Sequence, residues 1–311
     1  MTLHPNALGV DICKQHLDVF CPRCQRAQRI ANAPAAIETL MAQHPDAFFV
    51  FEATSGCDET LRGLLAQAKV PFARINPRRA REFARAAGVL AKTDRVDARV
   101  LAELGQRLEL APTLEPSMER QALSELVARR EQLVQEIVRE KNRLQQARSR
   151  TVRCDIESHI RLLERRRDKI ENAILELMRD SGELAPTAAK LRTIPGVGPI
   201  VAATLIAELP ELGVRDRRAI AALAGLAPLA NDSGRYKGKR RIWGGRRKVR
   251  RALFIAALQA SRRCPHWASL RQRMQAAGKA AKTILIAIAR KLLVAINAML
   301  RDDTPFNPRQ A

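Results

Sequence analysis

Four acidic residues stand where carboxylates from distant parts of the chain can meet. Asp11 lies near the end of one apolar segment, and Glu52 ends another. Asp94 and Asp97 are three residues apart at an expected helix start, so both can point from one helical face. Four carboxylates held close together repel one another unless cations lie between them, and Mg²⁺ prefers such hard oxygen ligands. The pattern predicts a site for two Mg²⁺ ions, roughly 4 Å apart, suited to phosphoryl transfer.

The same residues also allow a simpler interpretation without a metal. Acidic residues at strand ends are common in folded proteins. Asp94 in the first turn of a helix would also interact favourably with the helix dipole. The spacing alone leaves both interpretations open.

A serine precedes the most basic stretch of the chain. Ser233 lies in the sequence NDSG, and from Arg235 to Arg263 there are 12 basic and no acidic residues. Glycines in this stretch let the backbone approach a phosphate closely. Ser233 is therefore a candidate nucleophile, or only a hydrogen-bond donor in a plain phosphate-binding loop. DNA binding is expected from the basic residues Arg235, Lys237, Lys239, Arg240, Arg241, Arg246, Arg247, Lys248, Arg250 and Arg251.

Two glycines in the sequence IPGVGP indicate a further phosphate contact. Gly196 and Gly198 join two helix-like segments, as in a helix-hairpin-helix element, where glycine N–H groups at a helix start bind a DNA phosphate without reading bases. An ordinary interhelical turn explains the pattern as well. Cys21 and Cys24 form a CxxC pair, but no second CxxC or HxxxH follows, so zinc is the less favoured interpretation.

The charge distribution points to a polyanionic partner. The net charge of the 311 residues is +23, and residues 186–311 hold 25 basic and 6 acidic side chains. An excess confined to the last third is typical of a phosphate-binding surface and favours nucleic acid over a membrane. The most apolar segment, 283–300, contains Arg290 and Lys291, so we expect a core helix. No export signal is recognised and the cysteines show no framework spacing, which favours a cytoplasmic protein.

The segments that position these residues fall into three parts. Residues 1–112 alternate strands with helices, which is typical of an α/β domain. Residues 113–185 are expected to form a helical coiled-coil connector, because Ile156 and Leu163 begin a seven-residue apolar repeat. An antiparallel hairpin or a dimer arm fits this repeat. Residues 186–311 are expected to form a helical domain. Strands are expected at 7–13, 17–21, 25–32, 47–52 and 71–75, and helices at 34–43, 58–68 and from 77.

With these motifs laid out, the chain resembles a known family, the DEDD transposases of bacterial insertion sequences, in the insertion-sequence family one hundred and ten. The similar blocks span essentially the whole chain in family order, and together they are specific. They are GVDICKQHLDV, FEATSG, INPRRAREFARAAG, KTDRVDA, IPGVGPI and AGLAPLANDSGRYKGKRRI.

The resemblance implies a fold and a site. It implies an α/β plus α protein with a RuvC-like, ribonuclease-H-type first domain and a helical transposase domain. The four acids described above match the family's Mg²⁺-binding set, and Ser233 matches its catalytic serine. The expected activity cuts and rejoins DNA strands through a phosphoserine link between protein and DNA.

The resemblance also implies partners. Family members act as multimers with a composite site, so a homo-oligomer is expected, a dimer or a tetramer on DNA. A noncoding bridge RNA that pairs with both donor and target double-stranded DNA is expected as a guide. We therefore expect a bacterial protein that associates with the nucleoid when it acts.

Two rival functions remain at this point. A RuvC-like structure-specific endonuclease would hydrolyse DNA with metal-activated water, and Ser233 would be dispensable. A non-catalytic nucleic-acid-binding protein would bind DNA or RNA and be indifferent to Mg²⁺.

Overall fold

The computed structural model describes residues 3–54, 56–89, 94–113, 115–229, 232–233, 236–238 and 240–307. The chain divides into two compact units, Met1–Glu115 and Pro116–Ala311. Each unit has its own hydrophobic core and is described by itself.

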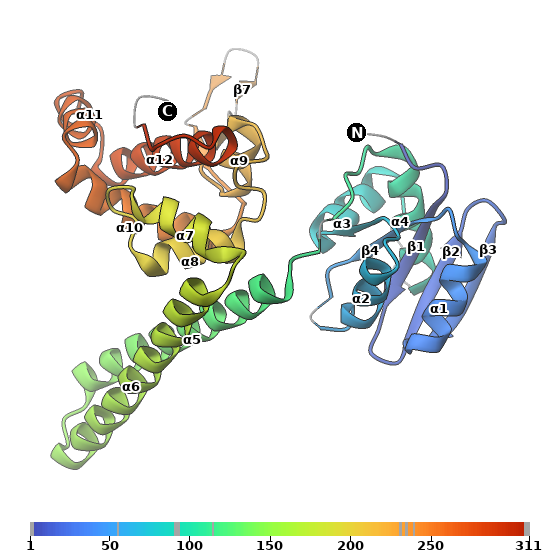
Figure 1. Cartoon of the computed structure of the whole chain (residues 1–311), viewed down its shortest axis with the longest axis horizontal. Helices are drawn as coiled ribbons and strands as arrows, with labels where there is room; N and C mark the ends of the chain where they lie inside the picture. The colour runs from blue at the N-terminus through green and yellow to red at the C-terminus, as the bar shows by residue number, and fades with distance from the viewer. Residues whose placement is uncertain are drawn as a thin grey trace. The chain divides into compact units, whose positions relative to one another are not determined.

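One sheet organises the first unit. Its strands are β1 (Ala7–Ile12), β2 (His16–Cys21), β3 (Arg26–Ala31), β4 (Phe48–Glu52) and β5 (Phe72–Ile75). The order across the sheet is β3-β2-β1-β4-β5, with β1 antiparallel to β2 and parallel to β4 (Figure 1). β1 and β4 are nearly continuous apolar runs, as expected for strands with both faces covered. All five strands lie where the sequence predicted them.

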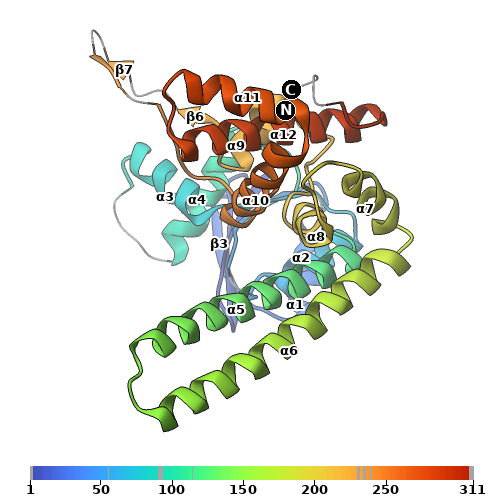
Figure 2. The ribbon, with the colours of Figure 1, turned by 90° about the vertical axis from the view of Figure 1, so that its left-hand side faces the viewer.

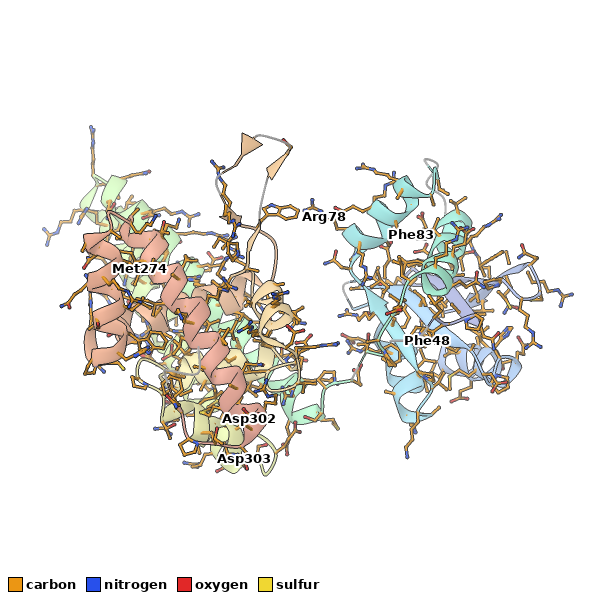
Figure 3. All side chains as sticks on the ribbon, turned by 90° about the horizontal axis from the view of Figure 1, so that it is seen from above. Phe48, Arg78, Phe83, Met274, Asp302 and Asp303 are labelled. Atoms are coloured by element: carbon orange, nitrogen blue, oxygen red, sulfur yellow. The ribbon has the colours of Figure 1, made fainter. Side chains whose placement is uncertain are left out.

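Helices cover both faces of this sheet. They are α1 (Pro34–Gln43), α2 (Glu59–Gln67), α3 (Pro77–Ala86) and α4 (Asp94–Arg107). α1 and α2 bury Ile37 and Leu61 against one face. On the other face, Leu101 of α4 packs with Phe48 of β4, and Phe83 of α3 packs against the same cluster (Figure 3). This mixed α/β arrangement is compatible with the expected RuvC-like domain.

Two long helices begin the second unit. They are α5 (Met118–Gln146) and α6 (Arg150–Asp180), and they run side by side as a hairpin (Figure 2). Leu133 and Ile137 of α5 pack with Leu163 of α6 in a small cluster. Arg130 Nε lies 2.7 Å from Glu171 Oε1 across the pair. The predicted long helices are confirmed, whereas a coiled coil with a second chain stays a prediction.

Six shorter helices complete the second unit. They are α7 (Leu184–Arg192), α8 (Pro199–Glu208), α9 (Arg217–Leu223), α10 (Arg247–Arg263), α11 (Pro265–Ala276) and α12 (Ala281–Asp302). Leu253 of α10 and Leu292 of α12 are fully buried in one core, which Leu123 of α5 joins. The arm and the C-terminal helices therefore form one unit. α12 is long and apolar enough to cross a membrane, but 56% of that window is buried, so it packs as a core helix.

The basic stretch has more regular structure than the sequence analysis expected. Four short strands, β6 (Pro228–Leu229), β7 (Asp232–Ser233), β8 (Tyr236–Lys237) and β9 (Arg241–Ile242), replace the expected loop. β6 pairs with β9, and β7 pairs with β8, so the segment forms a hairpin with Ser233 toward its tip. The second half of the stretch belongs to α10, because Val249 and Leu253 bury one helical face there.

Candidate acidic site and nucleic-acid interface

Asp11 and Glu52 directly follow a register pair on neighbouring parallel strands. Val10 of β1 pairs with Phe51 of β4, and both face the core under α1 and α2. Successive side chains of a strand point to opposite faces, so Asp11 and Glu52 face the side that α4 covers. Both are half-buried. Two carboxylates from distant segments therefore lie on the same face at the carboxyl ends of adjacent strands.

The direction of α4 is fixed by two close contacts with this face. Gly9 lies against Ala98 with no room for a side chain, and Gly105 lies against Ala7 in the same way. Ala7 precedes Gly9 whereas Gly105 follows Ala98, so the helix runs antiparallel to β1. Its first turn lies beside the carboxyl end of β1, where Asp11 stands.

That first turn carries the other two predicted acids. Asp94 precedes the buried Ala98 by four residues, and Asp97 precedes the buried Leu101 by four. Both therefore start from the helix face that covers the sheet. Asp97 is half-buried, whereas the side chain of Asp94 lies outside the described residues.

These positions fit a site for a hard cation. Asp11, Glu52 and Asp97 offer only oxygen ligands at one end of one sheet face, which is the donor type that Mg²⁺ prefers. Each of the three has an interaction partner within the chain. Among the residues that the structure describes, no three Asp, Glu, His or Cys side chains are grouped as metal ligands. The four-acid set therefore stays a prediction.

A fifth carboxylate at this face was missed by the sequence analysis. Asp18 of β2 pairs in register with Asp11 and is 3% exposed. It accepts hydrogen bonds from Nε and Nη2 of Arg29 at 3.0 and 2.7 Å, and His16 Nε2 lies 3.4 Å away. The guanidinium compensates for the burial of this charge. The sequence signal that could have identified Asp18 is the alternation of side-chain direction along β2, where Asp18 lies between two buried apolar residues.

Ser233 lies in the second unit, exposed in β7, and pairs in register with Tyr236. Its hydroxyl is therefore accessible to a large ligand. Arg235 and Lys239 of the predicted binding set, and the side chain of Lys237, lie outside the described residues.

Several predicted DNA-binding cations already have partners inside the second unit. They pair as Arg246 with Glu211, Lys248 with Glu208, Arg251 with Glu131, and Arg250 with the carbonyl oxygen of Gly244. In the described part of the chain, Arg240, Arg241 and Arg247 have no ion pair. The paired residues stabilise the unit, and contacts of the three others with phosphate stay a prediction.

The Arg246–Glu211 pair is bidentate. Arg246 Nη2 donates to Glu211 Oε1 at 2.6 Å, and Nη1 donates to the other carboxylate oxygen. Burial alone would raise the pKa of Glu211, but the hydrogen bonds and charge of Arg246 lower it below its usual value. The pair links the turn after α8 to the start of α10.

The two glycines of IPGVGP have different surroundings. Gly196 has a φ of 88° and packs against Ala256 and Ala260 of α10 without room for a side chain. An interhelical turn therefore explains Gly196. Gly198 is exposed and precedes the first residue of α8, with no atom near its missing Cβ. A helix-hairpin-helix contact with phosphate stays a prediction for Gly198.

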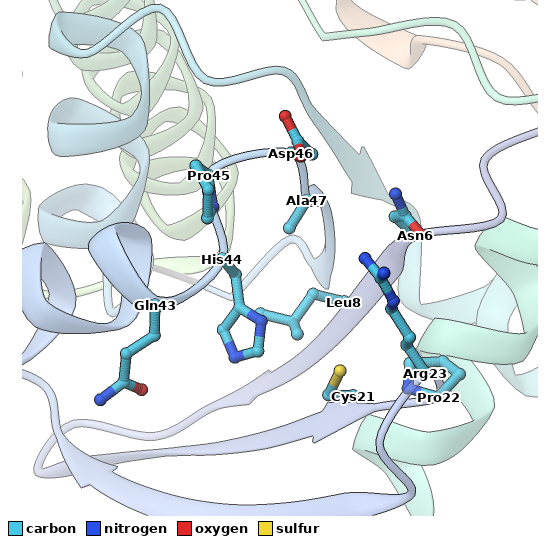
Figure 4. Close-up of a pocket in the computed structure, with 10 residues that line it drawn as sticks. All are labelled: Asn6, Leu8, Cys21, Pro22, Arg23, Gln43, His44, Pro45, Asp46 and Ala47. Atoms are coloured by element: carbon cyan, nitrogen blue, oxygen red, sulfur yellow. The ribbon is translucent and has the colours of Figure 1, made fainter.

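A pocket of about 90 Å³ lies at the other end of the sheet from the acids (Figure 4). Leu8, Cys21 and Ala47 line it, at the amino ends of β1 and β4. Cys21 and Cys24 are free thiols, and within the described ranges no third ligand joins them in a metal-binding group. The zinc interpretation of CxxC gains no support.

Comparisons with known proteins cover both units. A family model for DEDD transposases of IS110 matches residues 8–151, and one described as "Transposase IS116/IS110/IS902 family" matches residues 188–275. The chain is 31% identical to the "Pilin gene-inverting protein" of Moraxella lacunata over 97% of this chain and 98% of that protein. It is 32% identical to the protein of the same name from Moraxella bovis, over 76% and 74%. It is also 32% identical to the "Insertion element IS110 uncharacterized 43.6 kDa protein" of Streptomyces coelicolor, over 41% and 32%.

Proposed function

The chain belongs to the IS116/IS110/IS902 family of transposases, and from that premise we propose that it joins DNA strands through a phosphoserine intermediate on Ser233. The family makes it a DNA transposase or recombinase with DNA as its substrate. Asp11, Glu52, Asp94 and Asp97 would hold two Mg²⁺ ions, which when bound stabilise negative charge on the transferring phosphoryl group and the leaving oxygen.

One observation carries this proposal. Asp11 and Glu52 end neighbouring parallel strands on the face that α4 covers, and the first turn of α4 starts at Asp94 beside them. Acidic residues at the ends of two neighbouring strands and at the start of the helix that covers them support a metal site. The buried Asp18 beside them has Arg29 as its partner, so its charge is accounted for without a metal.

The proposed chemistry is balanced and needs no external energy source. The oxygen of Ser233 forms a bond to a DNA phosphorus, and the bond from that phosphorus to the 3′ oxygen breaks. The proton that the serine loses balances the proton that the 3′ oxygen gains. A second 3′ hydroxyl then attacks the phosphoserine, which forms the new DNA bond and restores the serine hydroxyl. The covalent link conserves the energy of the broken phosphodiester.

A composite site across subunits follows from the family resemblance. The acids belong to one unit of the chain and Ser233 to the other, at an exposed hairpin. A homo-oligomer, a dimer or a tetramer on DNA, would let the serine of one chain meet the acids of another.

A noncoding guide RNA would choose the DNA sites. With aromatic residues at 4% of the sequence, recognition of nucleic-acid backbones is favoured over stacking on unpaired bases. We expect RNA encoded beside the gene to copurify with the protein. Loss of site choice, but not of DNA binding, is expected after ribonuclease treatment.

Trapping the covalent intermediate tests the proposal. Wild-type protein with Mg²⁺, cognate RNA and labelled element ends should give a protein–DNA adduct that survives denaturation. Ser233→Ala should give none, whereas the control Ser149→Ala should give as much as wild type, since Ser149 lies in the α5–α6 turn without a side-chain cap bond. An adduct formed by Ser233→Ala would remove the serine from this role. Free DNA ends made by that variant would favour the endonuclease.

DNA inversion is a second candidate for the biological outcome. The relative from Moraxella lacunata, matched along nearly its whole length, is named for inverting a pilin gene. The same strand exchange gives inversion when both sites lie on one DNA molecule in opposite orientation. Recombination of plasmids that carry the sites in both orientations distinguishes inversion from insertion.

A further inference from the structure

A cavity lies between the foot of the β6–β9 hairpin and α12. Its volume is about 710 Å³, and Pro228 and Ile242 of the hairpin and Ile286 of α12 line it. Ligand sites of small molecules commonly measure about 300–1,000 Å³. The cavity is therefore large enough for a nucleotide, and its walls come from the hairpin that carries Ser233.

Four cations surround this cavity. Arg240 and Arg241 come from the hairpin, and Lys282 and Arg290 come from α12. Lys282, Ile286 and Arg290 follow one another at four-residue spacing, so they share one face of the helix. In the described ranges none of the four cations has an ion pair, and no acidic residue lines the cavity. The site therefore attracts an anion strongly.

The floor of the cavity is apolar. Leu226 is fully buried, and Ile242 and Ile286 are half-buried around it. A phosphate alone would need only the cations, whereas a nucleotide also brings a flat ring with apolar faces. Cations at the rim and aliphatic side chains below match a phosphate joined to an unstacked base.

The position of the hairpin indicates which DNA strand would enter the cavity. Pro228 at the cavity wall and Ser233 are five residues apart, so the chain between them spans at most about 18 Å. The phosphates of one DNA strand are spaced about 3.4 Å along the duplex axis, so this reach corresponds to about five nucleotides of a duplex. A DNA strand that presents a phosphate to Ser233 therefore has the cavity within its reach.

We propose that this cavity binds one unpaired nucleotide of the DNA strand, within about five nucleotides of the phosphate that Ser233 attacks. Its phosphate contacts Lys282, Arg290 and the hairpin arginines, and its base rests on Ile242 and Ile286. This inference rests on the proposed function, because the serine chemistry identifies the strand.

Equilibrium binding of the full chain in EDTA tests the proposal without any catalysis. The probe is a fluorescein-labelled single-stranded DNA of 20 nucleotides, as an intact strand and as a strand with abasic sugars. Lys282→Gln with Arg290→Gln should lower the slope of log affinity against log salt by about 0.7, the value for the one phosphate that both residues contact. The matched control, Arg271→Gln with Arg273→Gln on α11, removes two charges away from the cavity and should leave the slope unchanged.

A cavity-filling variant tests the place of the base. Ala287→Phe keeps every charge, so the salt slope should stay the same while affinity for intact DNA falls about tenfold. Affinity for abasic DNA should not change. Thr283→Phe, on an exposed residue of the same lining, gives a second variant if Ala287→Phe does not fold.

Three results would overturn the inference. The first is that Ala287→Phe lowers the affinity for intact and abasic DNA equally. The second is that the cavity double variant and the control double variant have equal salt slopes. The third is that the cavity variants weaken binding of an RNA strand of the same sequence but not of the DNA strand. Ser233→Ala should bind the strand as wild type does. If wild type forms no adduct while the cavity variants behave as expected, the serine chemistry fails and the nucleotide site stands.

Discussion

Two aspartates on one sheet face illustrate how different surroundings give a carboxylate different roles. Asp18 is buried and bound by Arg29, whereas its register neighbour Asp11 is half-buried at the end of β1, near Glu52. A buried ion pair loses stability when one partner is removed, because the remaining charge has no compensation. A carboxylate among other carboxylates carries repulsion that its removal relieves.

Replacing these two aspartates should therefore have opposite effects. Asp18→Asn should lower the free energy of unfolding by about 1–3 kcal/mol, because Arg29 loses its charged partner but is half exposed. Asp11→Asn should leave stability in EDTA unchanged or slightly higher and should abolish adduct formation. Urea denaturation and the adduct assay measure both effects. A strongly destabilised Asp11→Asn would mean that Asp11 serves the fold.

The Arg246–Glu211 pair gives a prediction about pH. Because Arg246 lowers the pKa of Glu211 in the folded protein, this pair stabilises the fold above the unfolded pKa, about 4.3. That contribution is lost as pH falls through the lower, folded pKa. Glu211→Gln should cost about 1–2 kcal/mol at pH 7, and its difference from wild type should shrink below about pH 4.

Denaturation of both proteins between pH 7 and pH 3 measures this difference. A constant difference across that range would show that the Glu211 carboxylate contributes through packing and not through its charge.

At the scale of elements, the contact of α4 with β1 positions the predicted acidic site. Gly9 has no space for a Cβ because the backbone of α4 at Ala98 and the side chain of Ala102 occupy it. The helix can approach the strand this closely at Ala98 because Gly9 has no side chain, and the approach brings the first turn of α4 to the end of β1. The acids therefore depend on a packing residue that carries no charge.

Gly9→Ala should damage stability and metal binding together. The added methyl group must push α4 away from the sheet, which costs about 1–3 kcal/mol or more. Gly63→Ala is the matched control, since Gly63 lies in α2 with open space around its Cβ and should be neutral or slightly stabilised. Thermal unfolding and Mn²⁺ titration measure the two effects. Full metal affinity in Gly9→Ala would show that the helix position does not control the site.

The elements also show what a sequence reading can and cannot predict. The strands of the first unit were predictable because apolar runs ended by turns have few alternatives, and α4 was predictable from its start at Asp94. The hairpin around Ser233 was not, because its strands are only two residues long and the segment that contains them is rich in arginine, lysine and glycine. The helical character of Arg247–Arg251 was missed because the charge pattern hid the buried face of Val249 and Leu253.

At the scale of the whole molecule, charge and chemistry are divided between two units. The first unit holds the acids and is close to neutral, and the second holds Ser233 and most of the +23 charge. The sequence identifies the basic residues, but it does not predict which of them form ion pairs. Glu208, Glu211 and Glu131 lie far from their partners along the chain, and only folding brings each next to its cation.

Crystals of the full chain soaked in Mn²⁺ test the central claim most directly. Mn²⁺ takes the same oxygen ligands as Mg²⁺ and gives an anomalous signal that locates it. The account predicts Mn²⁺ bound by Asp11, Glu52, Asp94 and Asp97 at the carboxyl ends of β1 and β4, and loss of that signal in Asp11→Asn. Mn²⁺ bound elsewhere, or bound equally well by Asp11→Asn, would contradict it.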